Sequence, residues 1–182
     1  MNILKRVVLA SLSLTFLTSG SVKASINEDH KVLINSLETI GVEFVLNDTE
    51  LCNPEDEVAG LYSPRHNVLV VCQDNRFTIS GKEVEWTEND YDTLRHESHH
   101  VLQDCVTGLD NHTMDKYFAG VSHGEFIRSV LSIDDINMIV EVYKENGASR
   151  ETIANELEAF AVATMTSPDV IAQQLETLCL SE

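Results

Sequence analysis

The stretch TLRHESHHVLQDC, residues 93–105, contains three histidines and a glutamate within a pattern typical of an amphipathic helix. Upstream, Thr87 is followed three residues later by Asp90, which is the signature of a helix capping box. Apolar residues then recur at helical spacing, at Tyr91, Leu94, Val101, Leu102 and Cys105. The sequence therefore predicts a helix that begins after Thr87 and lays one apolar face against a hydrophobic core.

Two of the histidines are placed to share a metal ion. His96 and His100 are four residues apart, which is close to one helical turn, so both imidazoles point the same way. They lie on the face of the helix roughly opposite to its apolar face. Together with Glu97 they form the pattern H-E-x-x-H, in which the two histidines suit Zn²⁺ and the glutamate can act as a general base on metal-bound water. His99 is expected to point off this face and to bind nothing.

A catalytic zinc ion needs a third protein ligand. The sequence Glu156-Leu157-Glu158-Ala159 lies in a predicted helix over residues 149–165. Here the chain resembles the gluzincin-type zincin metallopeptidases, in which the third ligand often lies in an E-x-x-A helix. The resemblance implies that His96, His100 and Glu156 bind Zn²⁺ and that Glu97 is the catalytic base. Glu158 and Glu125 are the alternative third ligands.

The resemblance extends to the segment AGLYSPRHNVLVV, residues 59–71, which is similar to the strands that border the cleft in such enzymes. The metzincin extension is absent, since Gln103 and Val106 stand where it has glycine and histidine. The interval from His100 to Glu156 is long and includes an apparent insertion over residues 107–132. We expect this insertion to fold over the cleft.

Hydrolysis also requires a group that stabilises an oxyanion, and zincins usually supply a histidine or tyrosine. His123, Tyr117 and Tyr143 are candidates, and His123 is taken as the catalytic candidate. The implied activity is hydrolysis of peptide bonds. The alternatives are a catalytically silent zincin-fold binding protein and a zinc hydrolase that acts on a non-peptide amide.

The remaining sequence predicts an α+β domain of the zincin-like type over residues 25–182. A helix over residues 26–41 precedes a strand over 42–46, and two more strands flank residues 64–67. Residues 76–86 are expected to add an extended segment. Helices follow over 132–146, 149–165 and from Ser167-Pro168 onward. We expect a small antiparallel or mixed sheet that packs on the H-E-x-x-H helix, followed by a helical C-terminal part.

The first 24 residues resemble a secretory signal peptide. Lys5 and Arg6 precede an apolar run over residues 7–17, and Val22 and Ala24 occupy the −3 and −1 positions of a cleavage site after Ala24. The run is short for a membrane span, which needs about 20 residues, although an uncleaved anchor is the alternative. The mature protein is expected to be secreted or periplasmic.

Charge and cysteine content agree with export. The chain carries a formal charge of −18, and loss of the three basic residues before residue 25 makes it more acidic. Such a charge disfavours nucleic acid and anionic membranes and favours cationic peptides; a monomer is expected. Four cysteines in an oxidising compartment predict two disulfides. The pairing Cys52–Cys72 with Cys105–Cys179 is preferred among three possibilities, and a tetrathiolate zinc site is disfavoured because no C-x-x-C pair exists.

Overall fold

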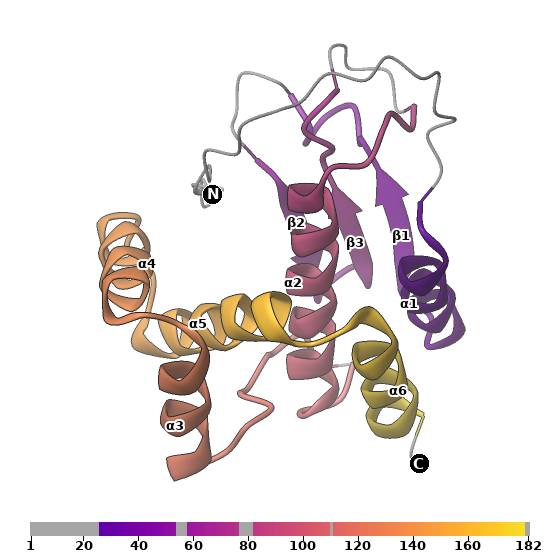
Figure 1. The fold of residues 1–182 in the computed structure, drawn as a ribbon. Coiled ribbons are helices and arrows are strands. Elements are labelled where there is room, and N and C mark those ends of the chain that lie inside the picture. The colour runs from indigo at the N-terminus through magenta and orange to yellow at the C-terminus, as the bar shows by residue number, and fades with distance from the viewer. Residues whose placement is uncertain (1–25, 54–57, 77–81, 110, 181–182) are drawn as a thin grey trace.

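The computed structural model describes residues 26–53, 58–76, 82–109 and 111–180. The expected signal peptide, residues 1–24, lies outside the described residues. Within them, the fold is α+β, as expected, with a small sheet and six helices (Figure 1). The elements are α1 (Glu28–Thr39), β1 (Glu43–Leu46), β2 (Gly60–Ser63), β3 (Val68–Val71), α2 (Glu88–Cys105), α3 (Val121–Val130), α4 (Ile133–Glu145), α5 (Arg150–Met165) and α6 (Pro168–Cys179).

The sheet is mixed, with the strand order β1-β3-β2. The central strand β3 pairs in parallel with β1 and antiparallel with β2, with Phe44 opposite Leu69 and Tyr62 opposite the same residue on the other side. β2 and β3 form the expected hairpin around residues 64–67. Strands β2 and β3 pack on α2, so the expectation of a small mixed sheet against the H-E-x-x-H helix is confirmed.

Helix α2 is the centre of the molecule. Figure 1 shows α5 crossing it, α6 and α1 at one end of α5, and α3 and α4 at the other. The main hydrophobic core joins α1, the sheet, α2 and α6, and a second, smaller cluster lies between α4 and α5. The expectation of one apolar face on α2 was too simple: every residue from His96 to Cys105 is buried, because the sheet, α5 and α6 cover the helix on several sides.

Capping residues explain where several of the helices begin. Thr87 and Asp90 form the expected capping box of α2, and Ser132 and Asp135 form another at α4. Proline occupies the first turn of α6. Helix α3 was not predicted as a separate element, because Gly120 at its N-cap offers no side-chain hydrogen bond. No strand forms at Arg76 or residues 82–86, and the rest of that expected extended segment lies outside the described residues.

Both preferred disulfides are present. Cys52, between β1 and β2, is bonded to Cys72, which directly follows β3, and Cys105 at the end of α2 is bonded to Cys179 at the end of α6. Within the described residues, no helix is both long enough and apolar enough to cross a membrane.

Candidate metal centre

Three buried side chains from two crossing helices meet at one point. His96 and His100 come from α2 and Glu156 comes from α5. The Nε2 atoms of the two histidines are 3.2 Å apart, and the Glu156 carboxylate lies 3.2 Å from His96 Nε2 and 3.5 Å from His100 Nε2. Ligand atoms of a tetrahedral zinc ion with bonds of about 2.0–2.1 Å are about 3.3 Å apart. The three side chains can therefore hold a metal ion with little rearrangement.

The protonation state of His96 suits a ligand. Burial lowers the pKa of His96, and the opposing effect of its hydrogen bond to the Glu156 carboxylate does not reverse the shift. The imidazole is therefore neutral and has a lone pair to offer a cation. Its Nδ1 atom is buried and has no hydrogen-bond partner among the described residues.

Gln103 fixes the orientation of His100. The Gln103 side-chain nitrogen donates to the backbone oxygen of Asn155 and to Glu158 Oε1, at 3.0 and 3.1 Å. Its oxygen must then accept from His100 Nδ1, at 2.8 Å. This bond places a proton on Nδ1 of His100, so that a neutral ring has its lone pair on Nε2, toward His96 and Glu156. Partners of this kind set the tautomer of metal-binding histidines.

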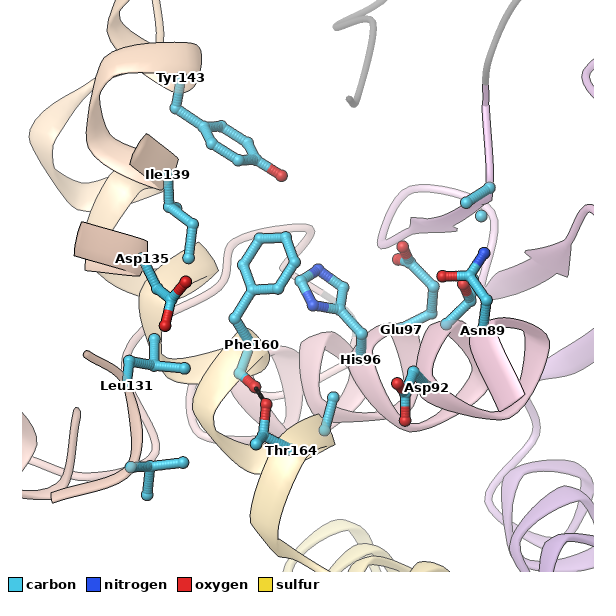
Figure 2. A pocket seen from close by; sticks show the side chains of 15 residues that line it. Asn89, Asp92, His96, Glu97, Leu131, Asp135, Ile139, Tyr143, Phe160 and Thr164 are labelled. Atoms are coloured by element: carbon cyan, nitrogen blue, oxygen red, sulfur yellow. Dashed lines mark hydrogen bonds between the residues drawn. The ribbon is translucent and has the colours of Figure 1, made fainter. Parts of the chain in front are cut away.

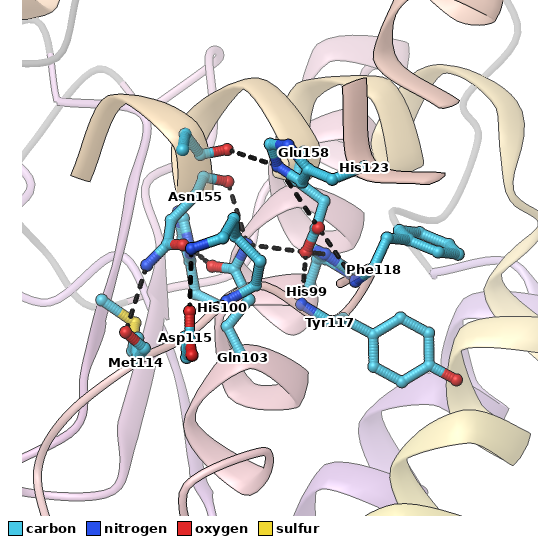
Figure 3. A network of polar contacts seen from close by, with 12 residues as sticks. His99, His100, Gln103, Met114, Asp115, Tyr117, Phe118, His123, Asn155 and Glu158 are labelled. Carbon is cyan, nitrogen blue, oxygen red and sulfur yellow. Dashed lines mark hydrogen bonds and ion pairs between the residues drawn. The ribbon is translucent and has the colours of Figure 1, made fainter. Parts of the chain in front are cut away.

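Glu158 belongs to a network of polar contacts that Gln103 connects to His100 (Figure 3). The carboxylate is fully buried and contacts His99 Nε2 at 2.7 Å, Gln103 Nε2 at 3.1 Å, the backbone N–H groups of Tyr117 and Phe118 at 2.8 and 3.0 Å, and His123 Nε2 at 3.5 Å. Burial alone would raise the pKa of Glu158, but the hydrogen bonds from His99, Gln103 and Tyr117 bring it below its usual value. Glu158 thus joins the segment before α3 to α2 and α5.

Three other residues that the sequence made candidates, His99, His123 and Glu125, lie outside the candidate metal centre. His99 points off the ligand face, as expected, but it bonds to Glu158. His123 approaches Glu158 and the backbone oxygen of Ala154, and it is absent from the described lining of the cavity beside the metal centre. Glu125 lies exposed on α3 and is not grouped with the two histidines.

Glu97, the candidate base, lies beside the candidate metal centre. It follows His96 on α2, is buried, and lines a cavity beside the metal centre (Figure 2). Its Oε2 atom accepts a hydrogen bond from the backbone N–H of Tyr62 at 2.9 Å. The Tyr62 hydroxyl in turn donates to Asp104 at 2.7 Å, and both burial and Asp104 raise the pKa of Tyr62. One residue of β2 is therefore bonded to α2 at two points.

The close approach of β2 to α2 depends on Gly60. A Cβ atom at this position would lie 2.6 Å from Thr93 Cγ2 and 3.0 Å from both Glu97 Cγ and the backbone oxygen of Val70. Any larger residue would push the strand away from the helix. The glycine thus lets the backbone of the edge strand border Glu97 directly.

Tyr143 is the oxyanion candidate that the fold brings to the site. Its hydroxyl donates to Glu156 Oε2 at 2.6 Å, and its side chain lines the cavity (Figure 2). Tyr117, by contrast, contributes its backbone to the Glu158 network. The position of Tyr143 follows from the packing of α4 on α5, which the spacing of residues in the sequence does not reveal.

The cavity has a volume of about 320 Å³. It lies between α2 and α4, and α5 contributes Phe160, Ala163 and Thr164 to its wall. Of the described residues in the apparent insertion, Val130 and Leu131 line it; the segment before α3 instead hydrogen-bonds to Gln103, Asn155 and Glu158. Most of the insertion therefore does not cover the cavity.

The fold and the site together define an α+β domain with a buried three-residue group, suited to a metal ion, beside a cavity. The chain belongs to the family described as a domain of unknown function, DUF8637, whose model matches residues 16–180. No curated protein and no solved structure matches the chain.

The sequence did not point to the roles of Gln103 and Glu158. The one local signal is the position of Gln103, three residues after His100 on the same helix face, where an amide can reach the histidine ring. Glu158 was considered as a ligand, and its contacts come from segments about 40 to 60 residues away in the chain.

Proposed function

We propose that the protein is an exported zinc metallopeptidase with a zincin-like arrangement of its catalytic residues. The observation that carries this proposal is the convergence of His96, His100 and Glu156, with ligand atoms 3.2–3.5 Å apart, next to a glutamate that lines a cavity.

The donor set fits zinc better than other common ions. Two neutral imidazoles and one carboxylate are the ligands of many catalytic zinc sites, whereas calcium and magnesium prefer oxygen alone. When bound, zinc lowers the pKa of a water ligand and polarises a substrate carbonyl. The cavity beside the ligands leaves room for a water molecule and a substrate.

The remaining chemistry belongs to residues of the chain. Glu97 accepts a proton from the attacking water and passes it to the leaving amine. The N–H of Tyr62 holds the Glu97 carboxylate in place through Oε2. The Tyr143 hydroxyl donates its one proton to Glu156 Oε2 in this structure. In the proposed reaction it turns from Glu156 to donate to the oxyanion that forms during attack.

Export is part of the proposal. Its support comes from the N-terminal sequence and from the two disulfides, which persist in oxidising compartments and are rare in the cytosol. We propose a monomer that acts on peptides.

One observation favours a second candidate, a zinc hydrolase of a small non-peptide amide. The cavity volume of about 320 Å³ lies near the lower end of the range of roughly 300–1,000 Å³ for small-molecule sites. The proposed chemistry is the same for both candidates. A catalytically silent binding protein would keep the metal ligands without turnover.

The test measures zinc content and cleavage of a mixed peptide library by the wild-type protein and by Glu97→Gln. Glutamine keeps the shape of the side chain but cannot accept the proton. We expect both proteins to hold about one zinc ion per chain and the variant to lose activity by about 10²–10⁴-fold. Glu125→Gln, the same change at an exposed position on α3, should leave activity unaltered.

Three results would contradict the proposal. If the protein contains no zinc after purification in zinc-containing buffer, the proposed metal site is wrong. Zinc without peptide cleavage would favour the silent scaffold, or a small amide substrate if the protein hydrolyses one. Equal cleavage by wild type and Glu97→Gln would exclude Glu97 as the base.

A further inference from the structure

We propose that the cavity between α2 and α4 binds a lysine or arginine side chain of a peptide, next to the bond that is cleaved. The proposal rests on the proposed peptidase function and adds the class of substrate. It is based on the order in which apolar and acidic side chains line the cavity, beginning at the metal ligands (Figure 2).

Two helices line the cavity with rows of side chains at helical spacing. On α4, Tyr143 lies next to the ligand Glu156, Ile139 is one turn away from it, and Asp135 is one turn further. On α2, the ligand His96 is one turn from Asp92. Each row therefore begins at the metal centre and carries a carboxylate one or two turns away.

Part of the cavity wall is apolar, from Phe160 beside the ligand His96 to Leu131, which precedes Asp135 by four residues. The Phe160 ring packs edge-on against the His96 ring, with centroids 4.5 Å apart. Further apolar lining comes from Val130, Leu131, Ile139 and Ala163. This surface matches the hydrocarbon stem of a long side chain, which lysine and arginine bury while their charged ends reach a polar region.

The other part of the lining is acidic. Among the described residues that line the cavity, Asp92 and Asp135 carry carboxylates in addition to Glu97, and there is no lysine or arginine. Asp135 Oδ2 serves the cap of α4 by accepting from Ser132, and the described residues form no hydrogen bond to Oδ1. Asp92 pairs with Arg95, but its side chain remains 55% exposed. Either carboxylate can therefore accept a hydrogen bond from a cationic group.

A purely apolar side chain fits this lining less well. It would fill the space at Phe160 and Ile139 but would also exclude water from the Asp135 and Asp92 carboxylates without replacing it by a hydrogen-bond donor, which is unfavourable. Lysine and arginine supply both the stem and the donors. The formal charge of −18 also favours the approach of cationic peptides.

Binding to the zinc-loaded Glu97→Gln protein tests this preference without turnover. The probes are alanine-based peptides that carry arginine, citrulline or norleucine at one position, and calorimetry gives their dissociation constants. Citrulline has the shape of arginine without its charge. We expect the arginine peptide to bind at least about tenfold more tightly than the citrulline peptide. Equal or tighter binding of citrulline or norleucine would overturn the proposal.

A second variant tests whether the preference for arginine arises in the cavity. When Asp135→Asn is added to the Glu97→Gln protein, the arginine peptide should bind less than about threefold more tightly than the citrulline peptide. The affinity for the citrulline peptide should stay unchanged, which shows that the fold is intact. Asp134→Asn removes the same charge from an exposed neighbouring position outside the cavity lining and should retain the full preference for arginine. A full preference in Asp135→Asn would overturn the assignment. If the binding preference holds but wild type cleaves none of the peptides, the peptidase function fails and the binding site stands.

Discussion

At the scale of single residues, the candidate metal centre depends on side chains that do not touch the ion. His100 directs its Nε2 toward His96 and Glu156 because the Gln103 side-chain oxygen accepts a hydrogen bond from the opposite ring nitrogen, Nδ1. Gln103 can do so because Glu158 and the Asn155 backbone oxygen hold its amide nitrogen. A buried carboxylate thus orients a ligand through an intervening amide.

We therefore expect Gln103→Ala to lower zinc affinity by about 10–100-fold, the usual effect of removing a residue that orients a metal ligand. The measurement is a competition titration with a chelator, which reports affinity independently of activity. Gln173→Ala makes the same truncation on the exposed face of α6 and serves as the matched control. Unchanged affinity in Gln103→Ala would show that His100 needs no such partner.

At the scale of elements, α1 is attached to α2 through His30. The neutral ring is held at both nitrogens, by Asn27 Oδ1 at 2.7 Å and by Arg95 Nη1 at 2.9 Å, and it stacks near Tyr91. Arg95 also donates to the backbone oxygen of Ala163 near the end of α5. Three helices therefore meet around one histidine that must stay uncharged.

This arrangement predicts a loss of stability in acid. Burial and the nearby Arg95 lower the pKa of His30 to about 4, from about 6.5 in the unfolded chain. The stabilisation is present above pH 6.5 and declines as the pH falls toward 4, because the unfolded state then binds the proton more readily. At pH 5 the contribution of His30 to the free energy of unfolding is smaller by about 2 kcal/mol than at neutral pH.

Urea unfolding at pH 7.5 and pH 5 checks this contribution. The decrease in the free energy of unfolding between the two pH values should be about 2 kcal/mol smaller in His30→Gln than in the wild-type protein. His66→Gln, at an exposed turn position, controls for the substitution itself. The same decrease in His30→Gln as in wild type would contradict the role of His30.

Local patterns predicted those elements and residues whose geometry is set within a few turns. The caps of α2 and α4, the spacing of His96 and His100, and the β2–β3 hairpin all depend on neighbouring residues. The parallel pairing of β1 with β3, and the positions of His123 beside Glu158 and of Tyr143 beside Glu156, depend on how distant segments pack. Sequence spacing holds no information about such contacts.

At the scale of the whole molecule, the Cys105–Cys179 disulfide closes a longer loop than Cys52–Cys72, with sequence separations of 74 and 20 residues. Loop-closure entropy in the unfolded chain then predicts stabilisation of about 4 kcal/mol for the first and about 3 kcal/mol for the second. We expect the Cys105→Ala, Cys179→Ala double variant to lose more free energy of unfolding than Cys52→Ala, Cys72→Ala. Urea titrations of the two variants give the comparison, and the reverse order would contradict it.

The positions of the two disulfides in the sequence also predict the order in which they form during synthesis. Cys52 and Cys72 leave the ribosome close together, whereas Cys179 follows Cys105 by 74 residues, about 4 to 15 s at a synthesis rate of about 5–20 residues per second. For that interval three cysteines coexist without the fourth. Early closure of Cys52–Cys72 removes the two wrong partners of Cys105. The Cys105–Cys179 bond then joins α2 to α6 after the last helix has been synthesised.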